Sequence, residues 1–178
     1  VYALRREGAL DAAAALGVPV VLMHMQGEPR SMQEAPDYED VVADVHRFLA
    51  ERIFSAEMAG IAKKRIVVDP GFGFGKTTAH NLALLARLER FIDLGVPVLA
   101  GLSRKRTIGE LTGRDDPHDR VVGSVAAHLI AAQRGARILR VHDVAATVDA
   151  LKIWNAVAAV PMPKAKSAAP AIRWPDDD

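Results

Sequence analysis

Four short apolar runs, separated by helical stretches, most constrain what this chain can fold into. They are near-continuous runs rich in Val, Ile and Leu, as in strands that are covered on both faces: residues 20–23, 66–68, 98–102 and 138–141. Strands that alternate with helices form βαβ units and therefore a parallel sheet. Two architectures fit this α/β pattern, a doubly wound sheet and a (β/α)₈ barrel. A complete barrel takes about 250 residues, and this chain holds only about four βα units.

Apolar spacing and helix propensity predict the helices between these strands. The expected helices cover residues 10–16, 37–59, 81–94, 121–134 and 143–160. Asp143 is a candidate N-cap for the last one. Residues 27–36 read as a loop. Residues 161–178 lack periodicity and are rich in Pro and Ala, so we expect one domain over residues 1–160 and a disordered tail after it.

Composition excludes several classes of protein. The 178 residues carry a formal net charge of +1, which does not indicate a nucleic-acid or membrane-surface partner. The chain has no cysteine, so a disulfide framework, a thiolate nucleophile and a cysteine-based metal site are excluded. No apolar run approaches the roughly 20 residues of a membrane-spanning helix. We therefore expect a cytoplasmic protein, and because the first residue is Val1 we expect the chain to start inside a longer one.

Every expected strand ends in polar or basic side chains. The second strand runs into Asp69 and a glycine-rich stretch, in the sequence IVVDPGFGFGK over residues 66–76. The other strands end in HMQG, SRK and RVHD. In parallel α/β folds the carboxyl ends of the strands meet at one edge, where ligands bind. A functional site is therefore expected there. The glycines match neither the Walker pattern nor GxGxxG, which argues against a nucleotide loop.

Taken together and in order, these runs resemble the C-terminal part of dihydropteroate synthase. The matching runs are LMHMQGEP, VVDPGFGFGK, GLSRKR, RVVGSVA and RVHDV, and the resemblance covers residues 1–159. It implies a (β/α)₈ barrel, of which this chain would hold about the last four βα units. It also implies a transferase of folate synthesis and a sulfonamide target. That enzyme condenses 4-aminobenzoate with 6-hydroxymethyl-7,8-dihydropterin pyrophosphate and forms 7,8-dihydropteroate and pyrophosphate.

The resemblance assigns pterin binding to Asp69 and Lys105. An ionised carboxylate offers two acceptors side by side, which suit the exocyclic amine and ring N–H of a pterin. Lys105 would donate to pterin acceptors. Without the resemblance, Asp69 could be a loop cap and Lys105 a solvated surface lysine. Ser103, near the start of a helix, would hold the carboxylate of 4-aminobenzoate.

Arg140 and His142 would bind the pyrophosphate. They lie two residues apart on a strand and therefore face the same way, and both can donate to phosphate oxygens. The alternative is that Arg140 pairs with a carboxylate such as Asp143 and that His142 caps a helix. Arg104, between the two neighbouring site residues, is expected to be a surface or packing residue.

The walls of the site would be apolar. Met23 and Phe74 can contact a flat heterocycle, and Gly73 lets the loop close over it. His24 lies on an apolar strand and is expected to be a hydrogen-bonded core histidine. Asp69, Lys105, Arg140 and His142 form the proposed catalytic set, and the binding set adds Met23, Gly73, Phe74 and Ser103.

The resemblance also implies Mg²⁺ as cofactor and a homodimer. No metal ligand is expected in this chain, because the family's metal-facing asparagine lies on the first strand, which would precede Val1. The dimer contacts would come from residues 121–134 and 143–157. Without the first four strands, we expect the segment alone to be inactive and aggregation-prone or dimeric. Two rivals remain: a methyltetrahydrofolate-type methyltransferase barrel and a non-catalytic homologue of the synthase.

Overall fold

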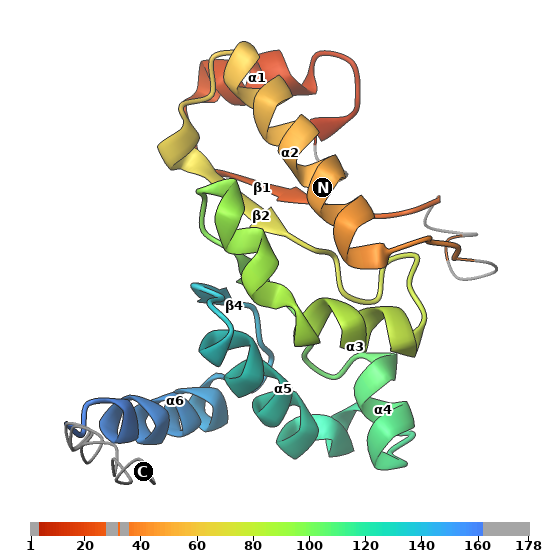
Figure 1. The fold of residues 1–178 in the computed structure, drawn as a ribbon, viewed down its shortest axis with the longest axis vertical. Helices are drawn as coiled ribbons and strands as arrows, with labels where there is room; N and C mark the ends of the chain where they lie inside the picture. The colour runs from red at the N-terminus through yellow and green to blue at the C-terminus, as the bar shows by residue number, and fades with distance from the viewer. Residues whose placement is uncertain (1–3, 28–31, 33–35, 162–178) are drawn as a thin grey trace, which may run out of the picture.

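The computed structural model describes residues 4–27, 32 and 36–161, and it holds four short parallel strands (Figure 1). The strands are β1 (Val20–Met23), β2 (Ile66–Asp69), β3 (Leu99–Ala100) and β4 (Ile138–Leu139). β1 pairs with β2 and β3 pairs with β4, both in parallel register. A parallel bridge between Val68 and Val98 connects the two pairs. The expected parallel arrangement is confirmed. The strands are neighbours in chain order, and within the described residues they do not close into a barrel.

The described residues also form six α-helices and three short 3₁₀ helices. The α-helices are α1 (Ala9–Leu16), α2 (Val41–Met58), α3 (Thr78–Ala86), α4 (Arg106–Thr112), α5 (Val121–Gln133) and α6 (Val144–Ala158). The 3₁₀ helices are η2 (Lys63–Arg65), η3 (Leu88–Leu94) and η4 (Pro117–Arg120). From α2 to α6, each helix packs against the next one along the chain (Figure 1). None of the helices within the described part of the chain is long and apolar enough to cross a membrane.

Capping side chains explain where two helices depart from expectation. The second helix begins at Val41, later than expected, because the Asp40 carboxylate accepts the N–H groups of Val42 and Ala43 at 2.9 and 3.3 Å. The helix expected over residues 81–94 is wrong in its bounds: it begins earlier, at Thr78, and continues after Ala86 as the separate 3₁₀ helix η3. Its start is set by Thr77, which exchanges hydrogen bonds with His80 in a capping box.

The strand pattern separates a buried face from an open one. Leu22 and Val68 are fully buried on the face covered by the helices, where burial of each such side chain contributes about 1.5–3 kcal/mol. Val21 points the other way and is 41% exposed. The expectation that both faces of every strand are covered is therefore wrong for the described residues, because helices pack on one face only. The expected tail over 161–178, except Pro161, and most of the expected loop over 27–36 lie outside the described residues.

Candidate functional site

Asp69 ends β2 on the strand face opposite the helix-facing core. It pairs in register with Met23, the last residue of β1, and it is only 4% exposed. Its Oδ1 accepts the N–H of Gly71 at 2.8 Å. Burial raises the pKa of Asp69 above its ordinary value, and the Gly71 hydrogen bond and nearby positive charges, first Lys105 and Arg140, oppose that rise. Asp69 is thus a buried acceptor surrounded by cations.

The loop after β2 runs close against the chain that follows β1. Gly71 has φ 72°, and a Cβ at this position would lie 1.8 Å from the carbonyl oxygen of His24. Gly75 has φ 62°, and a Cβ there would lie 2.4 Å from the carbonyl oxygen of Gln26. Only glycine combines a left-handed backbone with this close approach. These glycines therefore serve the contact between two strand-end loops.

Lys76, which the sequence argument left without a role, is buried at the centre of that contact. Its Nζ lies 2.9 Å from Nδ1 of His24 and donates to the carbonyl oxygens of Gly71 and Phe74, both at 3.0 Å. Burial lowers the pKa of Lys76 to about 7, although the charge of Asp69 opposes this. The sequence signal for this buried role was a single lysine at the end of a run of Gly and Phe.

His24 is the core histidine that the sequence predicted. It is 6% exposed, its ring packs edge-on against Phe48 with 4.9 Å between centroids, and Nδ1 has Lys76 as partner. Burial, followed by the charge of Lys76, lowers the pKa of His24 to about 3. The imidazole is therefore neutral at physiological pH, and its Nδ1 accepts from the lysine.

The side chains of Lys105 and Phe74 are in contact, as the expected pterin site requires. Lys105 is the N-cap residue of α4, its Nζ donates to the carbonyl oxygen of Phe72, and the same atom lies 4.6 Å from the centroid of the Phe74 ring. Burial lowers the pKa of Lys105 to about 8, with Asp69 opposing and Arg140 adding to the shift. An ammonium over an aromatic face is a cation–π contact.

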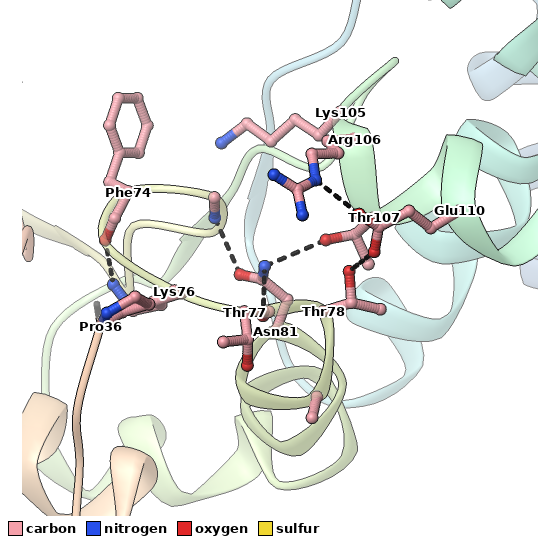
Figure 2. Close-up of a pocket in the computed structure, with 12 residues that line it drawn as sticks. Pro36, Phe74, Lys76, Thr77, Thr78, Asn81, Lys105, Arg106, Thr107 and Glu110 are labelled. Carbon is pink, nitrogen blue, oxygen red and sulfur yellow. Dashed lines mark hydrogen bonds and ion pairs between the residues drawn. The ribbon is translucent and has the colours of Figure 1, made fainter. Parts of the chain in front are cut away.

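A cavity of about 610 Å³ opens beside this pair (Figure 2). Its lining residues come from the loop after β2, from the starts of α3 and α4, and from the segment before α2: Pro36, Gly73, Phe74, Lys76, Thr77, Thr78, Ala79, Asn81, Lys105, Arg106, Thr107 and Glu110. Three predicted residues, Gly73, Phe74 and Lys105, are in this wall. Asp69 is not among the lining residues.

Asn81 connects the parts of this wall, a role that no sequence pattern predicted. Its Oδ1 accepts the N–H of Gly73 at 2.8 Å, and its Nδ2 donates to the Thr77 carbonyl oxygen at 2.9 Å and to Oγ1 of Thr107 at 3.0 Å. Figure 2 shows its amide between the loop and the two helices. A single asparagine on a helix gives no sequence signal for such a role.

Ser103 and His142 form a second pair, at the ends of β3 and β4. Oγ of Ser103 accepts the backbone N–H of His142 at 3.2 Å and lies 2.9 Å from its ring Nδ1. Ser103 is 6% exposed and is not in the cavity wall, so its assignment to the 4-aminobenzoate carboxylate gains no support from this geometry. Arg140 is exposed, and a Cβ on Gly101 would lie 3.1 Å from its Nη2.

The expectation that the Asp143 side chain caps α6 is wrong, and the alternative in which Asp143 pairs with Arg140 is not found either. Although Asp143 occupies the N-cap position of α6, it makes no side-chain capping bond. The reason is Arg104, whose Nη2 and Nε donate to the two carboxylate oxygens at 2.7 and 3.1 Å. Arg104, expected to be a surface or packing residue, is therefore part of an ion pair beside the site.

Comparisons with known proteins place the chain among pterin enzymes. The family model described as "Pterin binding enzyme" matches residues 2–142. The dihydropteroate synthase of Escherichia coli (strain K12) is 52% identical over 156 residues, which are 88% of this chain and 55% of that protein.

Two solved structures are more similar still. The dihydropteroate synthase of Stenotrophomonas maltophilia, with imidazole bound in its active site, is 75% identical with a TM-score of 0.89, over 91% of this chain and 61% of that chain. The Xanthomonas albilineans enzyme is 71% identical with a TM-score of 0.85, over 90% of this chain and 57% of that chain, in a structure with 4-aminobenzoic acid. Another structure of it is a complex with 7,8-dihydropteroate. This chain spans little more than half the length of these relatives.

Proposed function

The chain belongs to the pterin binding enzyme family, and we propose that its function is that of a dihydropteroate synthase. The resemblance read from the sequence motifs is thereby confirmed. The observation that carries the proposal is Asp69, a buried carboxylate at the carboxyl end of a parallel strand with Lys105, Lys76 and Arg140 as charged neighbours. That arrangement suits a flat heterocycle that offers adjacent N–H donors and has acceptors elsewhere on its ring.

In this proposal Asp69 and Lys105 hold the pterin. Asp69 accepts from the exocyclic amine and the ring N–H, and the ammonium of Lys105 turns from the Phe72 carbonyl to a pterin acceptor. The Phe74 ring below that ammonium supplies an apolar wall, and Met23, in register with Asp69, supplies another. The left-handed Gly73, whose N–H is bound by Asn81, sets the course of the loop over the ring.

Arg140 and His142 take the pyrophosphate. The C–O bond to the methylene carbon breaks, the electron pair leaves with pyrophosphate, and the arylamine nitrogen attacks the methylene and then loses a proton. Arg140 and His142 donate to the departing oxygens and stabilise their charge, and Asp69 stabilises the cationic pterin. Ser103 contacts the ring and the backbone N–H of His142, and in the proposal it also holds the carboxylate of 4-aminobenzoate.

Mg²⁺ is the cofactor that the resemblance implies. No three His, Cys, Asp or Glu side chains of the described residues gather to hold a metal ion. Mg²⁺ is commonly bound through one or two carboxylates and substrate phosphates. In the proposal its ligands are the pyrophosphate and residues outside this chain, and no step above depends on it.

We further propose that β1 to β4 are one wall of a (β/α)₈ barrel in a cytoplasmic homodimer. Strand neighbours in unbroken chain order support the barrel, since a doubly wound sheet reverses its order at a switch point. Exposed apolar side chains on α6, such as Ile153 and Val157, support the dimer. The open strand face around Val21 supports the expectation that residues 1–178 alone are inactive.

The test is formation of 7,8-dihydropteroate by the full-length protein from 4-aminobenzoate and the dihydropterin pyrophosphate. Asp69→Asn keeps the shape of the side chain but replaces one acceptor with a donor, and we expect kcat/KM to fall at least about 100-fold. Asn155→Ala, at an exposed position on α6, is the matched control and should keep full activity.

Binding of a sulfonamide and of 4-aminobenzoate separates the two rivals. Both should compete for one site in a synthase, whereas a methyltransferase barrel would bind neither. A non-catalytic homologue would bind them without turnover. Loss of turnover in Asn155→Ala equal to that in Asp69→Asn would contradict the roles assigned here.

A further inference from the structure

Arg104 has a backbone conformation that its side chain makes unfavourable. Its φ is 57°, and besides Leu4 it is the sole non-glycine residue of the described chain with a positive φ. For a residue with a Cβ, the left-handed region costs roughly 1–2 kcal/mol. Such a conformation persists only where surrounding contacts hold it, and it is often found at functional sites.

Both backbone groups of Arg104 are held by the start of α5 and the segment before it. Its N–H donates to Oγ of Ser124 at 2.9 Å, and its carbonyl oxygen accepts from Nη1 of Arg120 at 3.0 Å. Its guanidinium makes the two-bond contact with Asp143 and lies 2.9 Å from Nδ1 of His118. The side chains of Arg104 and Asp143 are only 22% and 18% exposed. A two-bond pair with this much shielding fixes orientation better than an ordinary surface ion pair.

The pair joins the two halves of the candidate site along the chain. Arg104 stands between Ser103 and Lys105, and Asp143 directly follows His142. One ion pair therefore fixes a neighbour of each of these site residues. The hydrogen bond between Ser103 and the backbone of His142 runs beside it and connects the same two segments.

We propose that Arg104 and Asp143 are positioning residues, which together set the Lys105 side of the site against the His142 side. The expected change in kcat/KM rests on the proposed function, whereas the expected change in the position of His142 does not. Neither residue lines the cavity, and each acts through its neighbour. The strained backbone of Arg104 is held by the pair with Asp143 and by the hydrogen bonds to Ser124 and Arg120.

The experiment compares Arg104→Gly, Asp143→Asn and the double variant in the full-length protein. Glycine adopts the left-handed backbone freely, so Arg104→Gly removes the guanidinium while keeping the loop, and its melting temperature should stay within about 4 °C of the parent. We expect kcat/KM for the pterin pyrophosphate to fall about 10-fold or more, and KM for 4-aminobenzoate to change less than about 3-fold. The double variant should be no worse than the poorer single one, because both remove one interaction.

Asp44→Asn is the matched control, because it breaks the ion pair of Asp44 with Arg47 on the surface of α2, away from α6 and from the candidate site. It should leave all kinetic constants unchanged. Unchanged kcat/KM in Arg104→Gly, or losses that multiply in the double variant, would overturn the proposal.

Nitrogen-15 NMR of the His142 ring gives a readout that needs no turnover. In the parent, Nδ1 should show the hydrogen bond to Ser103, and in Arg104→Gly and Asp143→Asn that signature should be lost. Asp44→Asn should keep it. If the parent enzyme forms no dihydropteroate, the proposed function fails, and the NMR comparison alone decides on the positioning pair. A His142 signature that persists in both variants overturns the pair whatever the activity.

Discussion

Lys76 is buried and Lys105 is half-buried, both near Asp69, but their hydrogen bonds suit them to different roles. Lys76 has three partners, the His24 ring and two loop carbonyls, so all three of its N–H donors are used inside the protein. Lys105 has one carbonyl partner and an aromatic face. Lys76 is therefore suited to hold the loop together, whereas Lys105 keeps donors for a ligand.

The pH dependence of activity should reflect the titration of the Lys105 ammonium group. Its pKa of about 8 means that the ammonium needed for donation is present below that pH and is lost as pH rises through it. We expect kcat/KM for the pterin substrate to fall above about pH 8. Lys105→Arg stays charged across the range, so it should lower activity but remove this alkaline fall. An alkaline limb at the same pH in Lys105→Arg would assign it to another group.

The loss of stability in acid should reflect protonation of the buried His24 ring on unfolding. Its pKa is about 3 in the folded state and 6.5 as its ordinary value, so the unfolded chain binds more protons between these limits. Stability is therefore fully present above pH 6.5 and falls with decreasing pH, by up to about 1.4 kcal/mol per pH unit. Urea unfolding of the full-length protein from pH 7 to 4 measures this. His24→Asn keeps an acceptor for Lys76 without titrating, so its slope should be shallower by that amount; equal slopes would refute the assignment.

At the scale of elements, the contacts of the loop after β2 could not be predicted from the local sequence. The alternation of Gly and Phe indicated a loop that closes over a ring, and Gly73 and Phe74 do line the cavity. The contacts of Gly71 and Gly75 with the chain after β1 were hidden, because they depend on a segment about 50 residues away. Asn81 was hidden for the same reason, since its partners lie on three elements.

Replacing Asn81 should loosen this assembly. Asn81→Ala leaves the Gly73 N–H and the Thr107 hydroxyl without their partner, which should lower the free energy of unfolding by about 1–3 kcal/mol. Asn155→Ala, on the exposed side of α6, should change it by less than about 0.5 kcal/mol. Urea titration of both variants in the full-length protein measures the difference. Similar values for the two would mean that the amide of Asn81 contributes nothing to the wall.

Strands and most helices followed from hydrophobic spacing, because burial of Leu22, Val68 and Leu49 on one side is a local pattern. Helix ends did not. Helix ends depend on which side chain caps the backbone, as Asp40 and Thr77 do. A carboxylate at an N-cap position can instead form an ion pair, as Asp143 does with Arg104. The identity of the site residues came from motif resemblance, whereas the pairing of Ser103 with His142 needed the fold.

At the scale of the whole molecule, one side of the sheet and one helix are under-covered. Val21 on β1 and Ile138 on β4 are 41% and 39% exposed, although strands of this composition are normally buried. α6 packs chiefly against α5 and extends away from the strands (Figure 1). In the proposal above, further barrel strands would cover the open strand face and a second copy of the protein would cover α6.

Dimer formation through α6 can be tested with one charge. Ile153 is 69% exposed and Val157, one turn further on, is 66% exposed, which makes an apolar patch of the kind that usually faces a partner. Ile153→Glu would bury a carboxylate in that interface and should convert a dimer of the full-length protein to a monomer at micromolar concentration, as measured by sedimentation equilibrium. Ala43→Glu adds the same charge on the exposed side of α2 and should remain dimeric. A monomeric parent protein would contradict the dimer. An Ile153→Glu variant that stays dimeric would mean that the interface lies elsewhere.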